Sequence, residues 1–449
     1  MKMARELRPG TRERHPGTRP RLVVGNGQGD VFEVPELEML GLSLRRTRRP
    51  RSTELIPLPY GSGLFELPDR MALAWDPVRK ATVRLDRYRG RAVRPVAAFL
   101  APAYTQIYRA AWARRADAAQ LPLYAYTAVG WEDGDFWAAA VRVDADIRQD
   151  PAQFDFTAVE AGAAKMASEH PDNRLVAHLM GNCVRKYRCP AACNLAMGRW
   201  ECPVPTSPTC NAACIGCLSA QPRHSVPPAQ PRIDFVPTIE EIVAFTVPHL
   251  EQAADAIISF GQGCEGEPLQ QAPLLEAAIR EIRSHTRRGT INLNSNASDP
   301  DAVEKLFRAG LDSIRVSLNS AQTGLYNGFF APRGYSFEQV RESMFRARAM
   351  GGWVSLNYFI FPGLSDHPVE MEALRALLQK TQPHYIQMRN LNLDPDRVID
   401  ELELEKLPGK PLGLRSWMRK VREWAPWIGF GYYNPPKERW EALCPDWSK

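Results

Sequence analysis

The feature that most restricts the fold of this chain is the alternation of short apolar segments with longer amphipathic segments after residue 204. The spacing of the apolar residues predicts strands for the short segments and helices for the long ones. Because a helix separates each strand from the next, the strands should run parallel, in a doubly wound sheet or in a barrel. The expected strands are 256–263, 289–296, 313–320, 353–363, 385–391 and 429–434, and the expected helices are 238–253, 270–287, 300–309, 336–350, 368–380 and 415–425.

Polar residues follow most of these strands at their carboxyl ends. In parallel α/β folds that edge of the sheet is where ligands bind. Capping of the following helices is the alternative, and it explains only part of the pattern. The residues in question are Gln262, Asn294, Asn296, Asn319, Gln387, Arg389 and Asn390.

The nine cysteines call for an explanation other than disulfides. The chain is 44% hydrophobic and 24% charged, which is typical of globular proteins. It contains no apolar run of the ~20 residues that a transmembrane helix needs, and its N-terminus lacks the apolar core of a secretory signal. We therefore expect a cytoplasmic protein with reduced thiols. Seven of the nine cysteines lie between Cys183 and Cys217, which indicates metal or cluster ligation.

Positive charge is concentrated at the N-terminus. Residues 1–51 hold 12 Lys and Arg against 6 Asp and Glu, which accounts for the whole net charge of +6. We expect residues 1–50 to form a basic arm with little order, either solvated or in contact with RNA. No aromatic residue lies among the arginines of 45–51, which weakens the nucleic-acid interpretation.

The rest of the chain divides by composition. We expect an α+β region of unknown role at 51–182, with a hairpin turning at Glu132–Asp135 and a helix at 158–169. A cysteine-rich segment at 183–203 should form a loop rather than a helix. The parallel α/β core should span 204–435, and residues 436–449 should form a C-terminal tail.

The strongest motif is Cys210-Asn-Ala-Ala-Cys214-Ile-Gly-Cys217, with the spacing C-x3-C-x2-C. Three thiolates on one loop can hold three corners of a cubane iron–sulfur cluster, since thiolate is the ligand that such clusters require. Three ligands instead of four leave one iron open to a small molecule. A zinc site or a chance grouping of cysteines is the alternative.

This motif, placed before a series of strand–helix units, resembles the signature of the radical S-adenosylmethionine (SAM) superfamily. The resemblance covers about residues 200–435. It implies a partial (β/α)6 TIM-like barrel, a [4Fe–4S] cluster on Cys210, Cys214 and Cys217, and SAM bound to the open iron. The family usually has an aromatic residue before the third cysteine, and this chain has Gly216.

Further residues match the SAM-binding elements of the family. Gly266-Glu267-Pro268 resembles the Gly-Gly-Glu-Pro element that holds the SAM amino group, with Glu265 in place of the first glycine as a competing candidate. Ser317 and Asn319 resemble the positions that contact the SAM ribose or carboxylate, and they share one face of a strand. Asn296 should face the same cavity, although small polar residues can also pack inward without a ligand.

The remaining cysteines leave several interpretations open. Cys183, Cys189, Cys193 and Cys202 could hold a second iron–sulfur cluster or a zinc ion, or could be buried thiols without metal, because their spacing matches no common zinc pattern. Cys264 lies inside the glycine-rich element and could give a hydrogen atom to a substrate radical. Packing as a small residue is its more ordinary role.

On this resemblance the protein is an enzyme in which the cluster reductively cleaves SAM to a 5′-deoxyadenosyl radical, which abstracts a hydrogen from a substrate. The substrate, whether small molecule, peptide or RNA, cannot be inferred, and a flavodoxin or ferredoxin is the expected electron donor. The alternative is a non-catalytic metal or iron–sulfur binding module whose basic arm contacts nucleic acid. The glycine-rich glutamate element favours the enzyme, since a binding module needs no SAM pocket.

Overall fold

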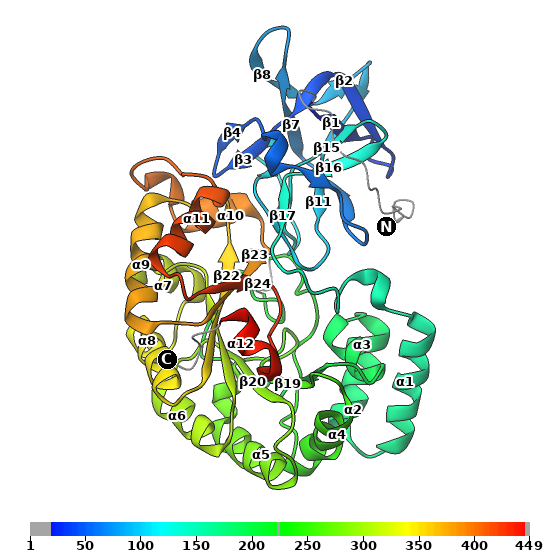
Figure 1. Cartoon of the computed structure of the whole chain (residues 1–449). Coiled ribbons are helices and arrows are strands. Elements are labelled where there is room, and N and C mark those ends of the chain that lie inside the picture. Colours follow the sequence, from blue (N-terminus) through cyan, green and yellow to red (C-terminus); the bar gives the residue numbers. More distant parts are fainter. Residues whose placement is uncertain (1–18, 222–224, 445–449) are drawn as a thin grey trace. The chain divides into compact units, whose positions relative to one another are not determined.

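The computed structural model describes residues 19–221 and 225–444 (Figure 1). The chain divides into two compact units. The first unit takes the chain up to Ala152 together with Ile360–Met371 and Met388–Lys420. The second unit takes Gln153–Phe359, Glu372–Gln387 and the chain from Val421. Each unit is described by itself below.

A seven-stranded parallel sheet, counted over the described residues, dominates the second unit (Figure 1). The strands follow one another across the sheet in chain order, which confirms the predicted parallel α/β fold. They are β18 (Glu201–Val204), β19 (Ile257–Phe260), β20 (Thr290–Ser295), β21 (Ser313–Leu318), β22 (Trp353–Ile360), β23 (Tyr385–Asn390) and β24 (Gly429–Gly431).

Helices connect these strands, mostly where the sequence predicts them. In the second unit they are α4 (Ile239–Gln252), η4 (Pro268–Gln271), α5 (Ala272–His285), α6 (Pro300–Ala309), α7 (Thr323–Phe330), α8 (Phe337–Ala349) and most of α9 (Pro368–Thr381). The helices α10 (Pro395–Glu401), η5 (Leu404–Lys406) and most of α11 (Leu414–Trp424) belong to the first unit. Side-chain caps explain the agreement, because they fix where a helix can begin. Thr238 and Ser336 form capping boxes with Glu241 and Gln339 at the starts of α4 and α8. The sequence analysis missed α7 and α10.

The segment before the sheet is helical, so the prediction of a loop at 183–203 is wrong. It contains α1 (Phe156–Glu169), α2 (Arg174–His178), the π-helix η3 (Leu179–Lys186) and α3 (Pro190–Ala196). Pro190 occupies the first turn of α3, where a proline starts a helix instead of ending one. Helix α1 confirms the expected helix at 158–169.

The expected C-terminal tail is also folded as far as the structure describes it. After η6 (Lys437–Arg439), helix α12 (Trp440–Leu443) carries a buried Trp440. The Trp440 ring stacks on Trp353 of β22 with centroids 5.1 Å apart. Residues 445–449 lie outside the described residues.

The first unit consists mostly of antiparallel strands. In the described part of the chain, ten of them form one sheet, in which β1 pairs with β2, β11 and β15. The strands are β1 (Arg21–Gly25), β2 (Val31–Met39), β3 (Gly41–Ser43), β4 (Arg46–Arg48), β5 (Ile56–Pro57), β6 (Gly63–Glu66), β7 (Arg70–Asp76), β8 (Ala81–Leu85), β9 (Arg87–Tyr88), β10 (Arg91–Ala92), β11 (Arg94–Phe99), β12 (Tyr104–Gln106), β13 (Arg109–Ala110), β14 (Trp112–Arg114), β15 (Val129–Glu132), β16 (Asp135–Ala138) and β17 (Ala140–Arg142), with short helices η1 (Ser52–Glu54) and η2 (Pro151–Gln153). The predicted hairpin is β15–β16, with Asp133 and Gly134 at positive φ in its turn.

The expected N-terminal arm is folded from Arg21 onward, so that prediction is wrong for residues 21–48. Alternate residues of β1 bury their side chains in two different clusters, Leu22 and Val24 in one and Val23 in the other. The sequence analysis interpreted this segment from its positive charge and overlooked the alternation of its apolar residues. Arg45 forms ion pairs with Asp400 and Glu405 within the same unit. Residues 1–18 of the expected arm lie outside the described residues.

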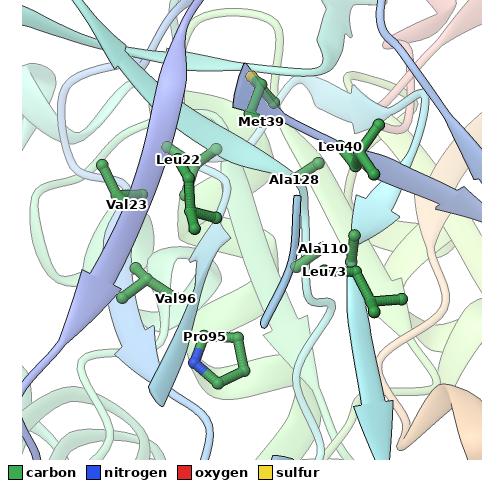
Figure 2. A pocket seen from close by; sticks show the side chains of 11 residues that line it. Leu22, Val23, Met39, Leu40, Leu73, Pro95, Val96, Ala110 and Ala128 are labelled. Atoms are coloured by element: carbon green, nitrogen blue, oxygen red, sulfur yellow. The ribbon is translucent and has the colours of Figure 1, made fainter. Parts of the chain in front are cut away.

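A small cavity lies among the strands of the first unit (Figure 2). Its volume of about 10 Å³ is close to the smallest space that holds one water molecule. Apolar side chains such as Leu22, Leu40 and Val96 surround it. The cavity is therefore a packing defect and offers no ligand site.

We predict that Asp394 is essential to the stability of the first unit. Its carboxylate lies 3.1 Å from Arg70 and accepts the Leu121 N–H at 2.8 Å, and both charged side chains are buried. The substitution Asp394→Asn leaves the Arg70 charge uncompensated, which should lower the free energy of unfolding by about 3–5 kcal/mol in urea denaturation. Asp400→Asn, at a half-exposed ion pair of the same unit, should cost less than about 1 kcal/mol. Equal losses in the two variants would contradict the prediction.

Candidate functional site

The three cysteines of the C-x3-C-x2-C motif lie on the loop between β18 and α4, in the second unit. The turn after β19 pairs with this loop through its backbone. Gly266 donates its N–H to Ser207 O at 2.6 Å, and Glu267 donates its N–H to Thr209 O at 2.9 Å. The first half of the loop is thus fixed before Cys210.

Helix α7 supports the other side of the loop. Ala213 and Ile215 donate their N–H groups to the carbonyls of Phe330 and Phe329, at 2.9 and 3.0 Å. The missed helix is therefore part of the site. A signal for it was present in the sequence, since Tyr326, Phe329 and Phe330 have the apolar spacing of a helix.

The three thiols are partly buried, and their surroundings do not favour free thiolates. Burial raises the pKa of both Cys210 and Cys214, and the nearby Glu267 carboxylate raises both further. Their three sulfurs do not form a group in which all lie within 4.8 Å of one another. One metal ion would require such a group, whereas in a cubane each thiolate binds its own iron.

Cys217 has polar neighbours of its own. Its Sγ lies 3.7 Å from Nη2 of Arg232 and 3.7 Å from Oγ of Ser219. Arg232 also donates from Nε to Ser219 Oγ at 3.2 Å, which orients its guanidinium group. A cationic side chain beside the sulfur stabilises negative charge on it.

Glu265 fastens the cysteine loop to the turn. Its Oε2 accepts hydrogen bonds from the Thr206 N–H (2.8 Å), the Thr206 hydroxyl (3.2 Å) and the Ser207 N–H (3.0 Å). Its Oε1 accepts the Gln262 N–H at 2.6 Å. Burial raises the pKa of this carboxyl to about 7, although these hydrogen bonds oppose the shift. Three of these four hydrogen bonds therefore fall on Oε2 and come from the cysteine loop, whereas Oε1 accepts only one.

Glu267 joins the turn to the end of β20. Its Oε1 accepts the Ser295 hydroxyl at 2.5 Å and the Leu269 N–H at 3.1 Å, and its Oε2 accepts the Asn296 N–H at 2.8 Å. Burial raises the pKa of this carboxyl to about 7 as well. Three of about four acceptor positions are used, which leaves one on Oε2.

Gly266 permits the close contact between the two loops. A Cβ at this position would lie 1.9 Å from the carbonyl oxygen of Thr209 and 2.5 Å from its carbonyl carbon. Both atoms belong to the backbone of the cysteine loop, so they cannot turn aside as a side chain would. The glycine predicted from the sequence is therefore needed for geometry.

Asn296 supports the loop next to Cys210. Its Nδ2 donates to Asn211 Oδ1 at 2.8 Å, and Asn211 in turn donates to Ser298 Oγ at 2.9 Å. The side chain that the sequence predicted to bind a cofactor is thus engaged with the residue that follows the first cysteine.

Two asparagines, one after β21 and one within β22, have an amide oxygen without a hydrogen-bond partner among the described residues. Asn319, which is 2% exposed after β21, donates from Nδ2 to Leu325 O at 3.1 Å, while its Oδ1 makes no hydrogen bond with the described residues. Asn357 of β22 pairs with the half-buried Ser317 of β21, and its Oδ1 is also buried without a partner there. The sequence analysis missed Asn357. Its signal was a polar residue inside the apolar strand segment 353–363.

Other polar residues near the strand ends form hydrogen bonds with one another or with the backbone. Asn294 accepts from Asn292 at 2.8 Å and from Asn434 at 3.3 Å, and Gln387 donates to Asn434 at 2.8 Å. Because Asn434 follows β24 and reaches β20, the sheet is strongly curved. In the first unit, Asn390 bonds the backbone of Tyr104. These side chains therefore have protein partners in the structure, and their predicted ligand contacts stay a prediction.

The sequence left three interpretations open for the four upstream cysteines: a second cluster, a zinc ion or buried thiols without metal. Within the described residues, Cys183, Cys189, Cys193 and Cys202 form no group with metal-binding distances. Cys202 is buried in β18 and Cys193 in α3. Cys183 instead lies beside Cys264, with the two Sγ atoms 3.9 Å apart.

We predict that Gly266→Ala prevents iron binding by the cysteine loop. The added methyl group meets the Thr209 carbonyl, so the two loops must separate and the cysteines shift. Iron bound per chain after anaerobic reconstitution should fall by at least half, because even a 1 Å displacement disturbs a preorganised site. Gly324→Ala, on α7 with open space around the new methyl group, is the matched control. Full iron content in Gly266→Ala would contradict this account.

Comparisons with known proteins agree with the geometry. The family model described as the radical SAM superfamily matches residues 204–376. The similar solved structures include HydG, a maturase of the [FeFe]-hydrogenase, with TM-score 0.35 and 17% identity over 60% of this chain and 62% of that one. A radical SAM methyltransferase from Sphaerobacter thermophilus gives TM-score 0.31 and 17% identity over 46% of this chain and 63% of that one. Methylornithine synthase (PylB) gives TM-score 0.33 and 11% identity over 64% and 77%.

The match spans less than two thirds of the HydG chain and of the methyltransferase chain, and at these TM-scores it carries no substrate over to this protein. No curated protein sequence matches this chain. Among the described residues, every helix is too short or too polar to cross a bilayer. The family match begins at the end of β18 and includes all three cysteines of the loop: residues 204–376 of this chain match the model of the radical SAM superfamily.

Proposed function

We propose that this protein is a radical SAM enzyme that holds a [4Fe–4S] cluster on Cys210, Cys214 and Cys217 and acts on a substrate still to be identified. The observation that carries the proposal is the cysteine loop, fixed on one side by the turn of Gly266 and on the other by α7. When bound, the cluster and SAM supply one-electron chemistry that ends in hydrogen abstraction from the substrate.

The donor set fits a site-differentiated cluster better than a zinc ion. Three thiols come from one loop, and their sulfurs do not share the short distances that a single ion requires. Three protein ligands leave one iron of a cubane for an exchangeable ligand. Arg232, beside Cys217, would offset part of the negative charge that the thiolates bring.

The acceptors at the neighbouring strand ends fit SAM. Glu267 has one acceptor position left on Oε2, and an ammonium group pairs well with a carboxylate. Asn319 and Asn357 each offer a buried amide oxygen without a partner among the described residues, which suits ribose hydroxyl groups. Ser317 lies next to Asn357 in the sheet register. We assign Glu265 to the loop and not to SAM, because three of the four hydrogen bonds that its carboxylate accepts come from Thr206 and Ser207 of that loop.

These residues would do three things during turnover. Gly266 and Glu265 keep the cysteine loop in place, Glu267 orients SAM, and the buried asparagines hold the ribose away from bulk water. A flavodoxin or ferredoxin as electron donor, and a cytoplasmic location, remain part of the proposal.

The alternative function, a non-catalytic module with a nucleic-acid-binding arm, has lost part of its basis. Arg45 and Arg49 of the basic segment are engaged in ion pairs inside the first unit. They are therefore only partly available to a polyanion.

We predict that replacing Cys210, Cys214 and Cys217 by alanine together removes about four irons per chain and abolishes the release of 5′-deoxyadenosine under dithionite. The matched control is Cys444→Ala, which deletes a buried thiol that donates to Trp427 O. This control should keep both iron and SAM cleavage. Reductive SAM cleavage by the triple variant would refute the proposed function.

We predict different losses for the two glutamates. Glu267→Gln should keep its iron but bind SAM about 10–150-fold more weakly, since a hydrogen bond to a charged group contributes about 1.5–3 kcal/mol. In Glu265→Gln an amide N–H group would face the backbone N–H donors of the cysteine loop. We therefore expect this variant to lose iron, in contrast to Glu267→Gln. Iron analysis and equilibrium binding of SAM separate the two. Unchanged SAM affinity in Glu267→Gln, with intact iron and weakened SAM binding in Glu265→Gln, would reverse the assignment.

A further inference from the structure

A second group of metal-binding side chains lies in the second unit, apart from the three-cysteine loop. One ring nitrogen of His178 and the sulfurs of Cys183 and Cys264 all lie within 4.8 Å of one another. Both cysteines are buried, at 3% and 5% exposure. Imidazole and thiolate are the ligands that zinc prefers in proteins.

The π-helix brings the first two ligands together. His178 ends α2, and Cys183 follows five residues later within η3. In an α-helix a step of five residues turns about 140° away from the starting face, given 3.6 residues per turn. A π-helix is wound with i→i+5 hydrogen bonds, so residues five apart come to lie above one another. Such segments are rare and frequently occur at functional sites.

The third ligand comes from the turn that follows a strand of the parallel sheet. Cys264 lies in the turn after β19, and its carbonyl accepts the Ile233 N–H at 2.7 Å. This turn is the one that carries Glu265 and Gly266. The group therefore joins the helical segment upstream of the sheet to the turn that holds the cysteine loop.

The distance between the two sulfurs fits a single tetrahedral ion. Cys183 Sγ and Cys264 Sγ are 3.9 Å apart. With Zn–S bonds of about 2.3 Å, two ligands at a tetrahedral angle lie about 3.8 Å apart. A disulfide needs about 2.05 Å, so the pair is not bonded covalently.

The His178 side chain is a hydrogen-bond partner of the Cys264 thiol. Its Nδ1 lies 3.4 Å from Asn182 Nδ2, and its buried Nε2 bonds no nitrogen or oxygen atom of residues 19–221 or 225–444. A divalent cation would neutralise the two thiolates.

We propose that His178, Cys183 and Cys264 form a mononuclear zinc site that fastens η3 to the turn after β19. Binding releases one proton from each thiol to solvent, so Zn²⁺ and two thiolates sum to zero charge inside the protein. Cys189, whose N–H donates to Cys183 O at 2.8 Å, places a further thiol beside the site. The grouping differs from the set of four cysteines considered in the sequence analysis, because it takes Cys183 alone from that set.

The test uses the full chain with Cys210, Cys214 and Cys217 replaced by alanine, so that failure of the proposed cluster cannot affect the result. This protein is stripped of metal under reducing conditions and titrated with Co²⁺, followed by competition with Zn²⁺. We expect one Co²⁺ per chain with a thiolate-to-cobalt charge-transfer band, which Zn²⁺ removes. In this background Cys183→Ala and Cys264→Ala should weaken binding at least about 100-fold, and His178→Ala at least about tenfold.

Cys193→Ala is the matched control, because Cys193 is equally buried on the adjacent α3 but lies outside the group. It should bind Co²⁺ as the parent does. If a ligand variant fails to fold by circular dichroism, X-ray absorption of the zinc-loaded parent decides instead, and it should find two sulfurs and a nitrogen. The absence of cobalt binding, equal loss in Cys193→Ala, a Cys183–Cys264 disulfide in non-reduced peptides, or iron with acid-labile sulfide at this site would each overturn the proposal.

Discussion

The site depends on one contact, the pairing of the cysteine loop with the turn after β19. Two elements distant in sequence approach until the backbone N–H of Gly266 reaches the carbonyl of Ser207 at 2.6 Å. No side chain fits there, since a Cβ on residue 266 would overlap Thr209. Glu265 adds three hydrogen bonds across the same contact and a fourth within the turn. A buried carboxylate that loses hydration is tolerated only when its acceptors are satisfied in this way.

The two glutamates on either side of Gly266 show how one turn can serve both structure and chemistry. They lie two residues apart but meet different partners. Glu265 reaches the backbone of the loop, whereas Glu267 reaches Ser295 and the N–H of Asn296. This difference in partners separates a residue that holds the cysteine loop from one that we propose orients SAM, and the tripeptide motif alone could not make this distinction.

The sequence predicted the strands and helices of the second unit well because local signals there agree with the fold. Thr238, Asp299 and Ser336 cap helices, and Gly310 ends α6 at a φ of 115°. The prediction of a basic arm was wrong because a count of charges does not show that Leu22 and Val23 pack into two different cores. The prediction of a loop at 183–203 was wrong because a proline can start a helix as well as break one. Asn294 and Gln387 were assigned to a cavity because spacing does not reveal that they bond Asn434.

The grouping of Cys183 with Cys264 lay beyond sequence reasoning for a related reason. Their separation of 81 residues has no spacing rule, and the approach of His178 to Cys183 depends on a π-helical register that propensities do not predict. The contact of Cys183 with Cys264 also affects the cysteine loop. Cys264 precedes Glu265 directly, so any group that fixes Cys264 also limits the motion of the carboxylate that holds Thr206 and Ser207. Packing around the upstream helices can therefore influence the cysteine loop without a shared ligand, through one short turn of the backbone.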